Sequence, residues 1–386
     1  MPYRIGIDAR QLQDPGPGAY IRNLVRGLAQ IDEDNTYVLF VGGRYDGELE
    51  GLPERFAMVT ERSPVFSLRE RVALSWRQYE QRLDLYHATH YTLPIWVPSR
   101  TVTTVYDIVD LFYPDFMPGR LSKYVAPAQI RATLSRSHRI IAASESTKED
   151  LVDYFDLRPR KIASVYPGID DAYGPDDDGD DHRIREELGL PGDYVLFRGD
   201  PRPHKNEECV LSAFAAATRG GDAQPHLVGI GDREIGGARF AHLLARLDLA
   251  SRVHWLDADA EVHLPALLRG ARLFLYPTLY EGLALPVVEA MACGVPVVTS
   301  RNAALREVAE NAAKLVEPSS VDSLAGAIGW CLNDRVLAAS LAADGLRRAA
   351  GFRWSRVAEQ TLEVYEAALS NGGARSRLLN RREPAS

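Results

Sequence analysis

Hydrophobic residues along this chain fall into short continuous runs that alternate with longer stretches of helical, amphipathic spacing. In the first half the runs are Tyr3–Ile7, Tyr37–Val41, Ala57–Thr60, Leu85–Ala88, Thr101–Tyr106, Arg139–Ala142 and Ile162–Val165. In the second half they are Tyr194–Arg198, His226–Ile230, Val253–Leu256, Leu273–Tyr276, Val295–Thr299 and Ala313–Val316. Short apolar runs separated by helices are typical of strands buried on both faces, so the pattern predicts an α/β protein with parallel sheets.

The two sets of runs are separated by an acidic segment, Asp176–Asp181, which contains no apolar residue. We interpret this segment as part of a solvated linker that is followed by a helical turn. The expected domains are residues 1–175 and residues 185–350, and a further helix is expected at about 352–370. The tail, residues 371–386, contains glycine, arginine and serine and is expected to be disordered.

The composition allows two hydrophobic cores, because 46% of the 386 residues are hydrophobic. A formal net charge of −8 gives no reason to expect a nucleic-acid partner. Three cysteines (Cys209, Cys293 and Cys331) lie in apolar helical surroundings without metal-ligand spacing. Such cysteines, with a first strand that begins without a signal peptide, predict a cytoplasmic protein. No apolar run approaches the roughly 20 residues of a membrane span.

One segment carries the clearest chemistry. The apolar run Leu273–Tyr276 is followed by a loop with Glu281, and Pro286 then opens a helix whose early part carries Glu289. Free amides at such a helix start form a seat for phosphate at the carboxyl ends of the strands. Carboxylates beside phosphates are better suited to accept hydrogen bonds from hydroxyls, so the segment suggests a sugar-nucleotide site. The alternative is a buried loop with two surface glutamates.

The segment Glu281–Val298 resembles the E-x7-E signature of retaining family 4 glycosyltransferases, with Leu283 and Ala284 in place of a phenylalanine and a glycine. The resemblance implies the GT-B architecture: two Rossmann-like domains face each other across a cleft, and the C-terminal helix crosses back to the N-terminal domain. By resemblance, Glu289 would hold the donor ribose and Glu281 the transferred sugar. The loop Gly282, Leu283, Ala284 and Leu285 would hold the diphosphate.

A second donor motif follows the run Tyr194–Arg198. It resembles the G-T-x-x-P-R-K-N segment of the same family, and it places Lys205 where the family has its phosphate-binding lysine. A lysine there neutralises a diphosphate leaving group, so no metal or other cofactor is expected. His204 replaces an arginine and Asp200 a small residue, and either Arg198 or Arg202 is the expected compensating cation on the donor side.

The expected acceptor domain begins with a glycine-containing turn. Gly16 and Gly18 lie between the first strand and a helix, where glycine lets the backbone approach a ligand. The order resembles the family's opening motif, so both glycines are candidates to line the donor diphosphate or the acceptor, with a purely structural turn as the alternative.

Two further motifs follow strands of this first domain. His87 and His90 resemble a motif of mannosyltransferase-like members and are candidates to orient an acceptor hydroxyl or move a proton. Tyr106-Asp107 stands where many members have His-Asp, so Tyr106 is an acceptor-side candidate and Asp107 a catalytic one, alongside Glu281, Lys205 and His90. The tyrosine does not titrate near neutral pH, which suggests an unusual sugar or acceptor.

Residues 67–82 form an amphipathic helical pattern with several arginines and one tryptophan. This pattern predicts either peripheral contact with the inner membrane surface or an ordinary surface helix.

The sequence as a whole predicts a retaining glycosyltransferase that moves a hexose from a nucleotide-sugar to a glycan or lipid-linked acceptor. The first expectation for the hexose is mannose, with GDP-mannose as the donor. The alternatives are a GT-B sugar-nucleotide epimerase or hydrolase, and a nucleotide-sugar-binding protein that has lost transfer activity.

Overall fold

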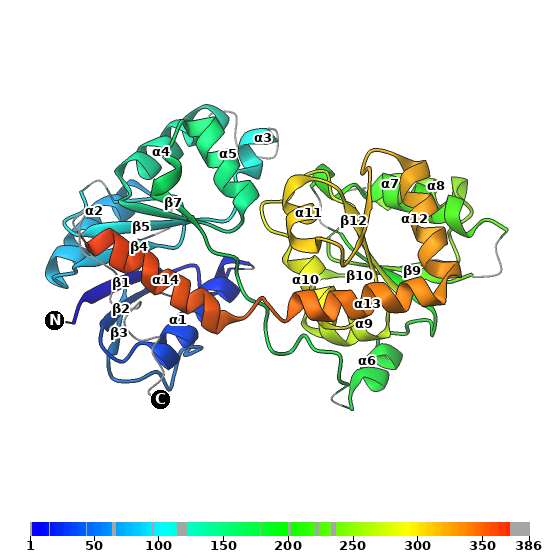
Figure 1. Ribbon diagram of the computed structural model, residues 1–386, viewed down its shortest axis with the longest axis horizontal. Coiled ribbons are helices and arrows are strands. Elements are labelled where there is room, and N and C mark those ends of the chain that lie inside the picture. The colour runs from blue at the N-terminus through cyan, green and yellow to red at the C-terminus, as the bar shows by residue number, and fades with distance from the viewer. Residues whose placement is uncertain are drawn as a thin grey trace, which may run out of the picture. The chain divides into compact units, whose positions relative to one another are not determined.

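The computed structural model describes residues 2–14, 16–43, 45–63, 67–94, 96–113, 122–177, 179–199, 202–220, 224–232 and 237–370. The chain divides into two compact units, Met1–Gly168 with Arg353–Ser386 and Ile169–Phe352. Each unit is a parallel β-sheet with helices packed around it (Figure 1). The predicted α/β class with two parallel sheets is therefore confirmed.

The first unit contains, among the described residues, a seven-stranded sheet in the order β3-β2-β1-β4-β5-β6-β7. Its strands are β1 (Arg4–Ala9), β2 (Thr36–Val41), β3 (Phe56–Thr60), β4 (Leu85–Ala88), β5 (Arg100–Val105), β6 (Arg139–Ala142) and β7 (Ile162–Ser164). Its helices are α1 (Pro17–Ile31), α2 (Leu68–Glu80), α3 (Val109–Phe112), α4 (Ser122–Arg136), α5 (Glu145–Phe155), η2 (Pro159–Lys161) and α14 (Trp354–Leu369).

The second unit contains, in its described part, a six-stranded sheet in the order β10-β9-β8-β11-β12-β13. Its strands are β8 (Tyr194–Arg198), β9 (His226–Ile230), β10 (Val253–Leu256), β11 (Leu273–Tyr276), β12 (Val297–Ser300) and β13 (Lys314–Val316). Its helices are α6 (Asp181–Glu187), η3 (Pro203–Lys205), α7 (Glu207–Thr218), α8 (Gly237–Arg246), η4 (Ala258–His263), α9 (Leu264–Gly270), α10 (Leu285–Ala292), α11 (Ala303–Ala309), α12 (Val321–Asn333) and α13 (Arg335–Ala349).

The C-terminal helix returns to the first unit, as the GT-B resemblance implied. In Figure 1, α14 lies alongside α1, and its Val357, Ala358 and Tyr365 belong to the same core as the first strands. Gly27 of α1 permits this close packing, because a Cβ at that position would lie 3.1 Å from the Ala358 Cβ. The small residues therefore let two helices from opposite ends of the chain share one core.

The boundary between the units differs from the expected one. We assigned residues 169–175 to the first domain, but the structure places them in the second unit. The Ile169 amide donates to the Phe352 carbonyl at 3.1 Å, and Arg269 of α9 donates to the carbonyls of Ala172 and Gly174 at 3.4 Å. These hydrogen bonds tie the segment to the second unit.

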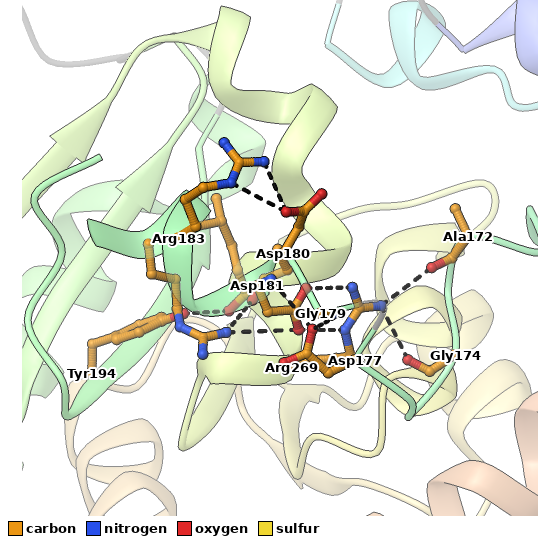
Figure 2. A network of polar contacts seen from close by, with 12 residues as sticks. Ala172, Gly174, Asp177, Gly179, Asp180, Asp181, Arg183, Tyr194 and Arg269 are labelled. Carbon is orange, nitrogen blue, oxygen red and sulfur yellow. Dashed lines mark hydrogen bonds and ion pairs between the residues drawn. The ribbon is translucent and has the colours of Figure 1, made fainter. Parts of the chain in front are cut away.

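The acidic segment is only partly solvated, so our interpretation of it was wrong at Asp181. That residue begins α6, and its two oxygens accept hydrogen bonds from Arg269 at 2.6 Å each (Figure 2). Its side chain is only 2% exposed, whereas Asp180 beside it is 58% exposed and pairs with Arg183. This buried ion pair could not be recognised from the sequence, because Arg269 lies 88 residues further along the chain. The predicted disordered tail, residues 371–386, lies outside the described residues.

Candidate active site

The candidate site of the second unit lies where two neighbouring strands end. β8 and β11 pair in parallel, so their carboxyl ends lie at the same edge of the sheet. The chain passes from β8 to β9 on one side, whereas β11 lies on the other side, which makes this pair the switch point of the sheet. The segment after β8 supplies Lys205, and the segment after β11 supplies Glu281.

Lys205, Tyr276 and Glu281 form a buried cluster. The Lys205 ammonium donates to Glu281 Oε1 at 2.6 Å and to the Tyr276 hydroxyl at 2.8 Å, and that hydroxyl donates to Glu281 Oε1 at 2.8 Å. An ammonium has three N–H donors, so one of them has no partner among the described residues. The second oxygen of Glu281 likewise accepts no hydrogen bond from the described chain.

The electrostatics keep the lysine charged. Burial acts to lower the pKa of Lys205, but Tyr276 and Glu281 outweigh it and raise the pKa above its usual value. The cluster is therefore a cation and an anion in contact, each with an unused hydrogen-bonding position.

The loops around the cluster are tied together. Asn206 has a left-handed backbone (φ 68°), and its side-chain amide donates to the carbonyls of Pro277 and Pro318 at 2.9 and 2.7 Å. The Leu279 amide donates to the His204 carbonyl at 2.7 Å. These bonds hold the Lys205 segment against the loop after β11.

Glu289 lies on α10, behind the first turn of the helix. Arg198 Nη1 lies 3.6 Å from Glu289 Oε2, and Tyr173 hydrogen bonds to the carboxylate. Burial raises the pKa of Glu289, and Arg198 opposes that shift. The amides of Ala284 and Leu285, at the start of α10, donate no hydrogen bond within the described chain. Such amides are available to an anion.

The remaining donor-side candidates take different positions. Gly282 and Ala284 are buried, and Leu283 and Leu285 are half-buried. Arg202 is half-buried at the start of η3, and His204 is 2% exposed. Asp200 lies outside the described residues. Within the described chain, no group of three or more His, Cys, Asp or Glu side chains is arranged to hold a metal ion.

In the first unit, a closed polar network lies at the end of β1. Arg10 donates to Asp8 at 2.8 and 2.6 Å, and the Tyr86 hydroxyl donates to Asp8 at 3.0 Å. Burial acts to raise the pKa of Asp8, but these donors lower it overall. The carboxylate is therefore ionised and fully engaged.

The two histidine candidates differ in their surroundings. His87 is fully buried, with its ring nitrogens 2.7 Å from the Tyr365 hydroxyl and 2.8 Å from the Thr104 hydroxyl. Both nitrogens are engaged, which argues against contact between His87 and an acceptor. His90 is half-buried against Tyr91, and burial lowers its pKa to about 4, so its imidazole is neutral near pH 7.

Tyr106 and Asp107 follow β5. The Tyr106 ring packs edge-on against Tyr20 with centroids 5.2 Å apart, and its buried hydroxyl has no hydrogen-bond partner among the described residues. Asp107 Oδ1 accepts from the amide of Val109, the first residue of α3, at 2.9 Å. The structure gives Asp107 a local structural contact.

The two glycine candidates have backbone roles. Gly16 precedes α1 with φ 78°, a conformation that favours glycine. A Cβ at Gly18 would lie 2.0 Å from the Leu12 carbonyl oxygen, so the turn requires glycine there.

Sequence reasoning missed two members of the site. Tyr276 was assigned only to a strand, and Glu261 of η4 was not considered. The signal for Tyr276 was its place as the last residue of a buried strand, where side chains reach the ligand edge. Nothing near Glu261 indicated that it would meet Arg198, 63 residues earlier.

Two parallel α/β units with a polar switch point in the second define the GT-B class of fold. Residues 16–173 match the family described as Glycosyltransferase Family 4, and residues 180–348 match the family described as Glycosyl transferases group 1. The two matches together cover well over half of the chain, one for each unit. The chain belongs to the glycosyltransferases that these families describe.

Curated relatives and solved structures agree with this class. The chain is 25% identical to O-antigen chain mannosyltransferase B of Escherichia coli, over 91% of this chain and 96% of that protein. It is 32% identical to the MMP alpha-(1->4)-mannosyltransferase of Mycolicibacterium hassiacum, over 61% of this chain and 55% of that protein. The fold matches Anabaena Alr3699/HepE in complex with UDP-glucose, with a TM-score of 0.73 and 19% identity over 95% of this chain and all of that one.

Proposed function

We propose that this glycosyltransferase moves a hexose from a nucleotide-sugar to a hydroxyl group, with retained configuration at the anomeric carbon and without a metal. The observation that carries the proposal is the Lys205–Glu281 pair, in which an unused ammonium N–H and an unused carboxylate oxygen lie at one strand edge. A phosphate oxygen can accept a hydrogen bond from the Lys205 ammonium, and a sugar hydroxyl can donate one to the Glu281 carboxylate.

The reaction needs a stabilised leaving group. The acceptor oxygen forms a bond to the anomeric carbon, the bond from that carbon to the phosphate oxygen breaks, and the acceptor proton passes to the departing diphosphate. Lys205 and the amides of Ala284 and Leu285 would stabilise the charge that develops on the diphosphate. Glu289 would accept from the ribose hydroxyls. In the first unit, the neutral His90 and the Tyr106 hydroxyl are the groups that would contact the acceptor.

Mannose from GDP-mannose is the first donor to test, because two of the relatives are named mannosyltransferases. Melting temperatures are measured with GDP-, UDP-, ADP- and dTDP-sugars on the wild type, Glu289→Gln and the exposed control Glu208→Gln. A ligand that binds the folded state raises the melting temperature. We expect one nucleotide to stabilise the wild type and the control but not Glu289→Gln. No shift with any nucleotide contradicts the proposal.

Turnover assays separate the remaining functions. Transfer to a glycan or lipid-linked acceptor with EDTA present supports a metal-independent transferase. Donor turnover without an acceptor indicates an epimerase or hydrolase, and stable donor binding without turnover indicates a binding protein.

For a lipid-linked acceptor, we expect contact between α2 and an anionic membrane surface. The side chains of Trp76, Tyr79 and Trp96 are more than half exposed. The ring centroids of Trp76 and Tyr79 are 5.9 Å apart, and those of Tyr79 and Trp96 are 6.1 Å apart. Exposed Arg69 and Arg82 lie on and just after the same helix. Aromatic side chains and arginines at one surface suit the headgroup region of a bilayer. No helix in the described chain has the length and apolarity to cross a membrane.

Vesicle sedimentation tests this contact. The wild type should bind vesicles that contain phosphatidylglycerol more than vesicles of phosphatidylcholine alone, and Trp76→Ser with Tyr79→Ser should lose that binding. Val262→Ser removes an isolated exposed apolar side chain of the second unit and is the control. Equal sedimentation of the double variant and the control would rule the contact out.

A further inference from the structure

Arg198, the last residue of β8, has a fixed orientation beside Glu289. Its Nε and Nη2 donate to the two oxygens of Glu261 at 3.2 and 2.8 Å, a two-pronged contact that fixes the plane of the guanidinium. The remaining nitrogen, Nη1, lies 3.6 Å from Glu289 Oε2. Glu261 thus fixes which edge of Arg198 is directed at Glu289.

Glu289 needs such a cation. Its Oε2 is buried and accepts no hydrogen bond from any described residue, and Arg198 is the cation of the described chain that lies beside that oxygen. The charged or titratable groups that face Glu289 are Arg198 from β8, Glu261 from η4, Asp170 and Tyr173 from the segment before α6, and Cys293 just after α10. Two of these groups, Glu261 and Asp170, are carboxylates, and their charge disfavours ionisation of Glu289 as a third.

We propose that Arg198, oriented by Glu261, is a positioning residue that keeps Glu289 ionised and directed toward the donor. The inference rests on the proposed function, in which Glu289 accepts from the donor's hydroxyls. An ionised carboxylate accepts hydrogen bonds from two hydroxyls at once. A protonated carboxyl group carries an O–H that must itself donate a hydrogen bond. Arg198 therefore acts on the donor through Glu289 and has no direct contact with the reacting atoms.

The proposal predicts a specific pH dependence. Burial already raises the pKa of Glu289, and Arg198 is the main group that lowers it. Removing Arg198 leaves burial, Glu261 and Asp170 to raise this pKa further. Glu289 then gains a proton as the pH falls, and donor binding weakens on the acid side.

Steady-state kinetics between pH 5.5 and 8.5 test this. In Arg198→Met, the donor KM should rise by about tenfold per pH unit below the new pKa, while kcat at saturating donor changes less than about threefold. Arg198→Lys keeps a positive charge and should restore much of the wild-type profile. Arg239→Met removes an exposed arginine of the same unit and should leave the profile unchanged.

The outcomes separate the two proposals. If the wild type turns over a donor and Arg198→Met shows the same KM change at every pH, Arg198 has only a structural role and the inference fails alone. If Arg198→Met unfolds, Arg198→Gln replaces it, because glutamine keeps a polar side chain without the positive charge. An acid-side rise in its donor KM larger than that of Arg239→Met supports the inference, and a profile like that of Arg239→Met overturns it. If the wild type neither binds nor turns over any nucleotide-sugar, the proposed function fails and the inference fails with it.

Discussion

Two buried ion pairs of the second unit differ in how completely they are hydrogen-bonded. In the Asp181–Arg269 pair, both carboxylate oxygens accept from the guanidinium, which also reaches two backbone carbonyls (Figure 2). In the Lys205–Glu281 pair, one N–H and one carboxylate oxygen have no partner in the described chain. The first pair is built to stabilise the fold. The second pair leaves hydrogen-bonding positions that a ligand can fill.

A buried ion pair can serve stability or ligand binding, and the number of its unused hydrogen-bonding positions distinguishes the two roles. A saturated pair has its desolvation offset inside the protein, so its removal leaves a partner buried and uncompensated. An unsaturated pair is poorly optimised for stability, which is typical of sites that complement a ligand. Stability and activity should therefore respond to different substitutions in the same domain.

The largest expected effect is on stability, at Asp181. Asp181→Ala leaves Arg269 buried without its carboxylate, which should lower the free energy of unfolding by about 3 kcal/mol or more. Urea denaturation measures this against Asp180→Ala, whose exposed pair with Arg183 should contribute less than about 1 kcal/mol. The donor KM of the folded Asp181→Ala protein should stay near the wild-type value. Equal losses of stability in the two variants would remove the distinction between them.

Lys205 should show the opposite behaviour. Lys205→Met removes the cation proposed to stabilise the leaving group, so kcat/KM should fall by about 100- to 1000-fold. The free energy of unfolding should fall by less than in Asp181→Ala, because Glu281 keeps its hydrogen bond from Tyr276 when the lysine is removed. Lys314→Met, which removes a lysine packed on Trp330 in the same unit, is the control and should retain activity. Wild-type kcat/KM in Lys205→Met would contradict the proposed role.

The sequence predicted one of these pairs and not the other. Lys205 and Glu281 follow strands that short apolar runs reveal, and their motifs place both at the same sheet edge. Asp181 was hidden in a run of acids, because neither burial nor a partner in a distant helix can be recognised from local composition. The same limit applies to Arg198, whose direction depends on Glu261, and to residues 169–175, which hydrogen bonds attach to the second unit.

The strands themselves were predictable because both faces of each parallel sheet are covered. Every predicted strand is present, and the shifts at the ends follow local bonds. For example, β12 begins at Val297 and not at Val295, because the Val295 amide still donates to the Ala290 carbonyl of the preceding helix. His87 shows the converse limit: its motif suggested a ligand, but packing against α14 places it in the core.

The smallest expected effect concerns the first unit and extends the same contrast to neutral groups. The buried Tyr106 hydroxyl has no partner in the described chain, and an unsatisfied buried hydroxyl destabilises a fold. Tyr106→Phe should therefore leave the free energy of unfolding unchanged or raise it by about 1 kcal/mol. If the hydroxyl serves the acceptor, the acceptor KM should rise by about tenfold while the donor KM stays constant. Tyr86→Phe is the matched control, because its hydroxyl bonds to Asp8, and its loss should lower stability. A destabilised Tyr106→Phe with an unchanged acceptor KM would mean that this hydroxyl, like Asp181, is a structural group.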